Sequence, residues 1–261
     1  MDLELHDRSV IVLAGTSGLG LGAAESLVRE GATVTVCSRS EERLAAAQDH
    51  LEAIGGGEVR AVSCDITDPD DIDRLIEGTV EATGGLDHIV ASTGGVPPGS
   101  MADLTDREWY QAYDLLMMSL VWTIEASREH LIASPGGSIT VITSTSVREP
   151  VDGLVLSNAV RRGVIGLVKT AARELAPDVR VNAVLPSAFD TPRIQELIDD
   201  AVETGRQPNH EAAMESWVSD IPLNRLGDPL ELGDMIAVLT SDRASFVTGA
   251  CLPVDGGRLR S

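Results

Sequence analysis

A glycine-rich turn near the start of the chain could bind a phosphate group. It consists of Gly15, Thr16, Ser17, Gly18, Leu19 and Gly20. An apolar, β-branched stretch at 8–14 precedes it, and a stretch with helical spacing at 18–30 follows. Glycines at such a junction let backbone N–H groups approach a pyrophosphate at the positive end of the helix. We therefore expect this turn to hold the phosphates of a dinucleotide.

The next strand-like stretch, 33–38, ends in two polar residues, Ser38 and Arg39. An acidic residue at this position would accept hydrogen bonds from the ribose 2′-hydroxyl of NAD. Arginine instead favours a 2′-phosphate, because its guanidinium is a permanent cation with a planar fork of donors. The sequence therefore favours NADP(H), with NAD(H) as the alternative. The alternative is that Arg39 forms an ion pair with Glu41 or Glu42.

Strand-like and helix-like stretches alternate along the whole chain and must position these residues. Strands are expected at 8–14, 33–38, 59–63, 86–91, 138–143, 180–185 and 251–254, and helices at 18–30, 41–54, 69–82, 106–133, 157–176 and 229–239. This alternation predicts one α/β domain over 1–261, with a parallel sheet covered by helices on both faces. The stretch 190–228 contains several Pro and Gly residues. It is expected to be an irregular, lid-like insertion beyond the strand ends, where doubly wound sheets bind ligands.

The composition limits the partners of the protein. The 261 residues carry 41 acidic and 20 basic side chains, for a formal net charge of −21. Such a charge argues against nucleic acid as a partner, because phosphate binding needs a basic face. Lys169 is the only lysine. An acidic, lysine-poor surface resembles that of halophilic proteins, in which concentrated salt screens the repulsion between carboxylates.

The sequence contains no signal for a membrane or a metal. No apolar run reaches the roughly 18 residues that a bilayer span needs, and the acidic start, 1–4, is unlike a signal peptide. We expect a soluble cytoplasmic protein. Cys37, Cys64 and Cys251 are far apart without CxxC spacing and are expected to be separate buried thiols.

Several further motifs resemble the short-chain dehydrogenase/reductase family. They are Cys64-Asp65-Ile66, Thr93-Gly94-Gly95, Arg180-Val181-Asn182, Leu185-Pro186-Ser187 with Thr191 beyond it, and the tail 246–257. The resemblance implies a single-domain Rossmann fold with a doubly wound, seven-stranded parallel sheet. It also implies that Asp65 and Ile66 contact the adenine, that Gly94 allows close approach of the cofactor, and that Pro186 and Thr191 flank the nicotinamide. Ala14 stands where the family has its first glycine, and Gly15 is expected to supply the flexibility instead.

The active site that the resemblance implies is where the sequence departs most from the family. Members use a Ser to hold the carbonyl, a Tyr to transfer the proton, a Lys to lower the Tyr pKa, and an Asn to support a water relay. Ser144 matches the Ser, whereas Leu116, Ser157 and Arg161 stand at the Asn, Tyr and Lys positions. The Ser-Asn-x-x-Arg pattern resembles a divergent branch described as 3-oxoacyl-carrier-protein-reductase-like.

These replacements change the chemistry that is available. An aliphatic hydroxyl is a far weaker acid than a phenol. An arginine stays charged, so it can bind ribose hydroxyls or polarise an oxygen but cannot act as a proton donor. Structural alternatives are a turn hydroxyl for Ser144, a helix N-cap for Ser157 and an ion pair for Arg161.

Other residues are expected to play structural roles. Tyr110 and Tyr113 lie at the front of a helix, away from the motifs. The histidines are expected on the surface or in packing: His6, His50, His88, His130 and His210. His210 lies in the insertion with Met214 and Trp217, which are interpreted as lid packing more readily than as substrate contacts.

The leading hypothesis is an NADP(H)-dependent oxidoreductase acting on a carbonyl or alcohol. Ser144, with Ser157, would orient the oxygen, Arg161 would stabilise negative charge, and the proton would come through water. The main alternative is a catalytically silent NADP(H)-binding sensor or oligomer partner. A dehalogenase-like lyase is disfavoured, because that offshoot keeps the Tyr and loses the dinucleotide site. In the family the helices corresponding to 106–133 and 157–176 pair subunits, which implies a homotetramer or homodimer.

Overall fold

Seven parallel strands form one sheet in the computed structural model, which describes residues 2–260. The strands are β1 (Ser9–Val12), β2 (Thr33–Ser38), β3 (Val59–Ser63), β4 (His88–Ala91), β5 (Ser138–Ile142), β6 (Arg180–Pro186) and β7 (Cys251–Val254). Their spatial order is β3-β2-β1-β4-β5-β6-β7. The order reverses between β1 and β4, which creates a crevice at the carboxyl ends of these strands. The predicted doubly wound Rossmann arrangement is confirmed.

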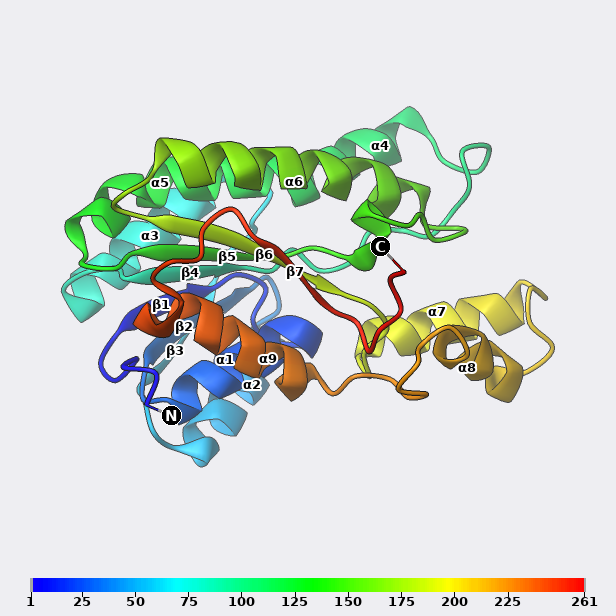
Figure 1. Cartoon of the computed structure of the whole chain (residues 1–261), viewed down its shortest axis with the longest axis horizontal. Coiled ribbons are helices and arrows are strands. Elements are labelled where there is room, and N and C mark those ends of the chain that lie inside the picture. Colours follow the sequence, from blue (N-terminus) through cyan, green and yellow to red (C-terminus); the bar gives the residue numbers. More distant parts are fainter. Residues whose placement is uncertain (1, 261) are drawn as a thin grey trace.

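Helices cover both faces of the sheet (Figure 1). On one face lie α1 (Gly18–Arg29), α2 (Glu41–Ile54) and α9 (Pro229–Thr240), and on the other lie α3 (Pro69–Thr83), α5 (Ser119–Ala133) and α6 (Val155–Glu174). Successive strand residues point to opposite faces. Val10 and Val12 therefore pack under α1 and α9, whereas Ile11 and Leu13 pack on the opposite side of the sheet.

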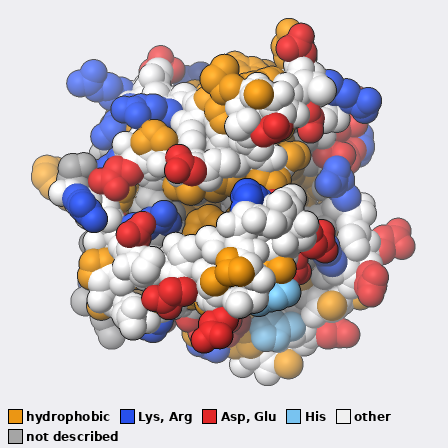
Figure 2. Space-filling model, turned by 90° about the vertical axis from the view of Figure 1, so that its right-hand side faces the viewer, with side chains coloured by type: hydrophobic (Ala, Val, Ile, Leu, Met, Phe, Trp, Pro, Cys, Tyr) orange, Lys and Arg blue, Asp and Glu red, His pale blue; other side chains and the backbone are white. Residues whose placement is uncertain are grey.

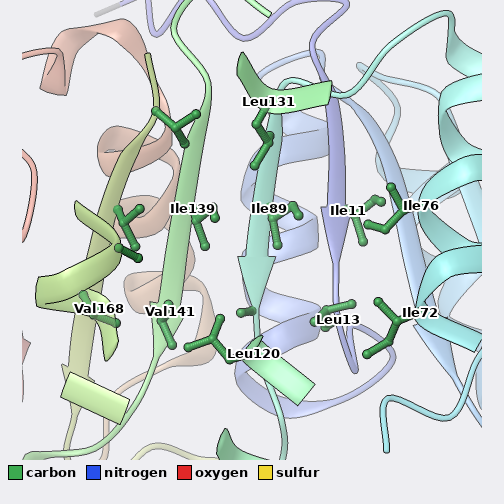
Figure 3. Close-up of a cluster of buried hydrophobic side chains, with 14 of the residues drawn as sticks. Ile11, Leu13, Ile72, Ile76, Ile89, Leu120, Leu131, Ile139, Val141 and Val168 are labelled. Carbon is green, nitrogen blue, oxygen red and sulfur yellow. The ribbon is translucent and has the colours of Figure 1, made fainter. Parts of the chain in front are cut away.

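The core under α3 and α5 consists of closely packed branched aliphatic side chains. Figure 3 shows Ile11, Ile89 and Ile139 side by side on neighbouring strands, facing the side chains of the covering helices. All three are fully buried. Burial of such a side chain contributes roughly 1.5–3 kcal/mol, so this layer holds the strand ends in fixed positions.

The helix expected at 106–133 is interrupted. It consists of α4 (Asp106–Tyr113), a π-helical turn (Asp114–Met118) and α5. A π-turn inserts one extra residue, with i→i+5 hydrogen bonds in place of i→i+4 bonds, but the chain stays helical on both sides, so the sequence was interpreted as one helix. The interruption falls at Leu116, which lies on the side of the helix that faces α6.

The stretch 190–228 was expected to be irregular, and this prediction was wrong in detail. It contains α7 (Pro192–Glu203) and α8 (His210–Val218). Pro192 is the first residue of α7, a position where the missing N–H costs nothing. Thr191 and Asn209 accept N-cap hydrogen bonds from the first turns of α7 and α8. Pro192, interpreted as a breaker, therefore starts a helix, and Pro208 directly precedes the N-cap of the next one.

The two helices α7 and α8 have a small core of their own beyond the strand ends (Figure 1). Ile194 and Ile198 of α7 pack with Ala213 of α8, and Met214 and Trp217 join this cluster. Met214 and Trp217 pack against this cluster as expected, and Trp217 also lines the cavity described below. A hydrogen bond of 3.0 Å between His210 Nε2 and Asp199 Oδ1 links the two helices on the surface.

No helix among residues 2–260 has the length and apolar character needed to cross a membrane.

A buried histidine makes the stability of the fold depend on pH. His88 in β4 is 2% exposed, and its Nδ1 lies 3.0 Å from Ser138 Oγ. Burial lowers the pKa of His88 to about 3, against the attraction of neighbouring Asp87. Between pH 6.5 and about 3 the unfolded chain binds a proton that folded His88 does not bind. The free energy of unfolding should therefore fall by up to about 1.4 kcal/mol per pH unit below pH 6.5 through this residue.

Urea unfolding at pH 7, 6 and 5 and constant salt measures this dependence. His88→Asn keeps a polar partner for Ser138 but does not titrate, so its stability should fall less steeply than that of the wild type. Equal slopes for the two proteins would contradict the assignment to His88.

Candidate functional site

A cavity of about 610 Å³ opens at the carboxyl ends of the strands, where the strand order reverses. It is lined by nearly all of the residues singled out in the sequence: Thr16, Ser17, Gly18, Leu19, Gly20, Ser38, Arg39, Asp65, Ile66, Gly94, Ser144, Ser157, Arg161, Pro186 and Thr191. Gly15 is the exception. The structure thus brings segments that are far apart in the sequence to one site.

The glycine-rich turn uses its residues differently from the prediction. Ala14 itself adopts the left-handed conformation, with φ of 45°, which costs a residue with a Cβ about 1–2 kcal/mol. Gly15 lies behind the turn, where an added Cβ would be 2.9 Å from both Val12 O and Val36 Cγ1. Gly15 therefore permits close packing onto the sheet, and the expected role in flexibility was wrong.

The first turn of α1 leaves its backbone donors free. Ser17 is the N-cap residue, but its side chain makes no capping hydrogen bond. In contrast, Ser40 and Thr191 cap α2 and α7. The first N–H groups of a helix have no partner within the helix, and the helix dipole makes them attractive to anions. With the Gly20 backbone close against Ala14 O, this uncapped end fits the pyrophosphate of a dinucleotide.

Two arginines lie at the end of the cavity next to β2. Arg39 is 76% exposed, and its Nη1 lies 3.6 Å from Asp65 Oδ2. Arg39 therefore pairs with Asp65 and not with Glu41 or Glu42. Arg43, one helical turn further along, lines the same end. Arg43 was not predicted as a cofactor contact, although it lies four residues after Arg39, in the first turn of α2. Together they suit a 2′-phosphate.

Asp65 is held as a carboxylate. Its Oδ1 accepts hydrogen bonds from Thr67 N at 3.0 Å and Thr67 Oγ1 at 2.7 Å. Burial alone would raise its pKa, but these hydrogen bonds and the charge of Arg39 hold the pKa of Asp65 below its usual value. A fixed carboxylate next to Arg39 keeps this arginine in place at the cavity wall.

Two of the three cysteines meet beneath this end of the cavity. Pairing of β2 with β3 brings Cys37 next to Cys64, and both line the cavity. The hydrogen bond between them lowers the pKa of Cys37 and raises that of Cys64. Burial of both thiols was predicted, but their contact was not, because it depends on the strand pairing.

The two serines of the expected active site both line the cavity, and each contacts Ser146. Ser144 Oγ accepts a hydrogen bond of 3.1 Å from Ser146 N, which caps the short 3-10 turn Thr145–Val147. The Ser144 hydroxyl proton is thus free to point into the cavity. Ser157 is 9% exposed, and its Oγ lies 3.5 Å from Ser146 Oγ. Ser157 is no N-cap, because α6 begins two residues earlier, at Val155.

Arg161 binds backbone carbonyl groups. Its Nη2 donates to Gly94 O at 2.6 Å, and its Nη1 to Ile142 O at 3.2 Å and Thr143 O at 3.5 Å. Within residues 2–260 it has no carboxylate partner, so the ion-pair alternative is wrong. Burial, with a contribution from the charge of Arg193, lowers the pKa of Arg161 to about 10, so it stays protonated at neutral pH. It joins the ends of β4 and β5 at the cavity floor.

The position of the relay asparagine is apolar. Leu116 is buried and packs against Val96, Leu156 and Val160, so it can hold no water. Tyr110 and Tyr113 are exposed and lie outside the cavity lining. The surface histidines pair with carboxylates: His6 with Asp7, His50 with Glu25, His130 with Glu77 and His210 with Asp199. In the described part of the chain, no histidine or tyrosine lines the cavity.

The outer end of the cavity is lined by residues that the sequence analysis did not assign to it. Arg193 of α7, Trp217 of α8 and Arg258 of the C-terminal segment line it. Arg258 lies over the Trp217 ring at 6.0 Å from its centroid. Figure 2, which views this end of the molecule, shows a recess with Lys and Arg side chains along it and carboxylates scattered around it.

Comparison with known proteins agrees with this architecture. Residues 13–258 match the family described as enoyl-(acyl carrier protein) reductase. The 3-oxoacyl-[acyl-carrier-protein] reductase of Thermotoga maritima is 29% identical over 256 residues, which cover 98% of this chain and 99% of that protein.

Two solved structures are similar over nearly their whole length. The L-sorbose reductase of Gluconobacter frateurii, in complex with NADPH and L-sorbose, has a TM-score of 0.94 at 26% identity, with 100% of both chains covered. The NADPH-bound short-chain oxidoreductase of Pseudomonas aeruginosa PAO1, which contains an atypical catalytic centre, has a TM-score of 0.88 at 28% identity, with 97% of both chains covered. The family match over most of the chain, the strand order and the glycine-rich turn agree: this chain belongs to the short-chain dehydrogenase/reductase family of oxidoreductases.

Proposed function

We propose that the protein is an NADP(H)-dependent oxidoreductase that interconverts a carbonyl and an alcohol at an atypical active site. One observation carries this proposal. A single cavity joins the uncapped end of α1 to the hydroxyl groups of Ser144 and Ser157. A dinucleotide bound along it would extend from the arginines beside β2 to the serines.

The residues around the cavity would hold the cofactor as follows. The N–H groups of Gly18, Leu19 and Gly20 bind the pyrophosphate, and Arg39 and Arg43 bind the 2′-phosphate. Asp65 and Ile66 border the adenine, and Gly94, Pro186 and Thr191 border the nicotinamide. NADP(H), when bound, supplies or accepts the hydride. The NADPH complexes of the two similar structures support this choice of cofactor.

The residues near the reacting carbon would orient the substrate, and water would supply or accept the proton. The Ser144 hydroxyl donates a hydrogen bond to the substrate oxygen, and Ser157 provides a second hydroxyl in the same cavity. An arginine has five N–H donors, and Arg161 directs only part of them to Gly94, Ile142 and Thr143. The remaining donors and the fixed charge stabilise negative charge on the oxygen.

A second candidate is a catalytically silent NADP(H)-binding protein. Two observations favour it. Leu116 is apolar where the family has the asparagine of its water relay, and Arg161 already donates hydrogen bonds to three backbone carbonyls. This candidate predicts cofactor binding without turnover. The similar oxidoreductase with an atypical catalytic centre binds NADPH, which supports cofactor binding in both candidates.

The test is a titration with NADPH and NADH, followed by turnover on a panel of ketones, aldehydes and alcohols in low and high salt. NADPH should bind more tightly than NADH. Ser144→Ala should lower kcat by about 10²–10³-fold, the usual cost of removing one donor to the reacting oxygen, without changing NADPH affinity. Ser219→Ala, an exposed residue outside the cavity, is the control. Binding with no turnover across the panel would favour the silent candidate.

We also propose that the protein is cytoplasmic, adapted to high salt, and a homotetramer or homodimer. The exposed small residues Ala159, Gly163 and Gly166 along α6 support self-association, since they let a second helix approach closely.

A further inference from the structure

The charge of the cavity is opposite to that of the protein. Acidic residues outnumber basic ones by 41 to 20 in the chain, yet five arginines and two carboxylates line the cavity: Arg39, Arg43, Arg161, Arg193, Arg258, Asp65 and Glu196. A concave site of one sign inside a surface of the other focuses the potential on its ligand. Arg39 and Arg43 lie at the adenosine end. The other three arginines come from α6, α7 and the segment after β7 and require a different explanation.

Arg258 is held in the cavity wall by a tight turn after β7. The Asp255 carboxylate accepts hydrogen bonds from Gly257 N at 2.9 Å and Leu259 N at 2.8 Å. Gly256 has a φ of 64°, and an added Cβ would lie 2.6 Å from Ile221 Cγ2. Ser187 Oγ donates to Asp255 O at 3.0 Å, which joins the turn to the end of β6. The turn therefore fixes the position of the Arg258 Cα atom.

The guanidinium of Arg258 has no acidic partner within residues 2–260. Among the residues that the structure describes, no carboxylate lies within ion-pair distance of it, and its N–H groups donate to no acceptor. Arg258 Cζ lies over the Trp217 ring, 6.0 Å from its centroid. A cation over an aromatic face keeps its N–H edge free. That edge matches the two oxygens of a carboxylate or a phosphate.

Arg193 strengthens the positive charge at the same end of the cavity. Its Nη2 donates to Val96 O at 2.6 Å, and its Nη1 lies 3.0 Å from Glu196 Oε2. The side chain lies against Gly95, where an added Cβ would be 2.7 Å from Arg193 Nε. Arg193 is therefore fixed by its hydrogen bonds, and Glu196 offsets part of its charge. The turn fixes the backbone of Arg258, whereas its guanidinium makes no hydrogen bond or ion pair with the residues that the structure describes.

We infer that the substrate of the proposed reaction carries an anionic group, a carboxylate or a phosphate, and that Arg258 binds it while Ser144 binds the reacting oxygen. The inference rests on the proposed function for the reaction, but the anion site can be tested without turnover. Arg193 adds to the attraction without being the main contact.

Two matched substrate pairs test the inference: 5-oxohexanoate with its methyl ester, and dihydroxyacetone phosphate with dihydroxyacetone. At constant salt the wild type should show at least about tenfold higher kcat/KM for the anionic member of one pair, and this pair identifies the anion. Arg258→Leu should raise KM for that anion by about 10–100-fold, the effect of one charge-assisted hydrogen-bonded pair. Its kcat, its NADPH affinity and its KM for the neutral member should stay unchanged. Arg258→Lys should recover part of the loss.

Arg260→Leu is the matched control, because it removes the same charge from an exposed residue outside the cavity. An equal loss in Arg260→Leu and Arg258→Leu would overturn the inference in favour of a long-range effect of charge. Turnover of neutral substrates with no preference for either anion would also overturn it, while leaving the proposed function intact.

A binding experiment separates the two proposals if no substrate is turned over. Calorimetric titration of the NADPH-loaded protein with glutarate, dimethyl glutarate and inorganic phosphate measures anion binding directly. Binding of glutarate or phosphate that is lost in Arg258→Leu would support the anion site although the reaction failed. No binding of either anion to the wild type would overturn the inference.

Discussion

Gly20→Ala is expected to lower NADPH affinity by at least about 100-fold. An added Cβ at this position would lie 2.6 Å from Ala14 O and 3.2 Å from Gly15 Cα, both in the backbone of the turn. Neither atom can move aside as a flexible side chain could, so the start of α1 must shift. Loss of two charge-assisted hydrogen bonds to the pyrophosphate, each about 1.5–3 kcal/mol, accounts for this effect. Fluorescence titration with NADPH measures it.

Gly78→Ala is the matched control for this variant. Gly78 lies in α3, and an added Cβ would meet nothing within 4 Å. The substitution should leave NADPH affinity unchanged and raise the free energy of unfolding by up to about 1 kcal/mol, because alanine favours the helix. Wild-type NADPH affinity in Gly20→Ala would show that the turn does not hold the pyrophosphate in the way proposed.

Arg161→Met is expected to lower kcat/KM by at least about 100-fold and to weaken NADPH binding. Methionine fills much of the same volume but leaves Gly94 O, Ile142 O and Thr143 O without their donor. A buried acceptor that loses its partner costs about 1–3 kcal/mol, so the ends of β4 and β5 should shift where the nicotinamide would lie. Steady-state kinetics, NADPH titration and urea unfolding together measure the effect.

Two further variants separate the guanidinium geometry from its charge. Arg161→Lys keeps the charge, but one ammonium group cannot span carbonyls of both strands, so its activity should fall between those of Arg161→Met and the wild type. Activity equal to the wild type would show that the charge alone matters. Arg162→Met removes a charge from the exposed neighbouring residue and should leave activity unchanged.

Local sequence patterns predicted most of the elements that build the site. The bounds of β2, α2, β3 and β7 agree with the predicted ranges, because alternation, helical periodicity and end residues such as Ser40 act over a few neighbouring residues. The helices α7 and α8 were missed because Pro192, the first residue of α7, and Pro208, next to the N-cap of α8, were interpreted as breakers. The signal was present at Thr191 and Asn209, which accept the first hydrogen bonds of these helices.

The residues that depart from the family were also visible in the sequence, but their consequences were not. Arg161 at the lysine position shows that the charge is kept. That its guanidinium binds three backbone carbonyls follows only from the positions of Gly94, Ile142 and Thr143 at neighbouring strand ends. In the same way, the contact of Cys37 with Cys64 depends on the pairing of β2 with β3.

By itself the sequence determined the fold class, the glycine-rich turn, the candidate site residues Ser144 and Arg161 and the acidic composition. Only the tertiary structure decided that Arg193, Trp217 and Arg258 line the same cavity and that Arg258 lies over the Trp217 ring. These residues come from α7, α8 and the segment after β7, and no local pattern relates them. The physical reason is that helix and strand propensities depend on neighbours in the chain, whereas a binding site depends on how the sheet and its covering helices bring distant segments together.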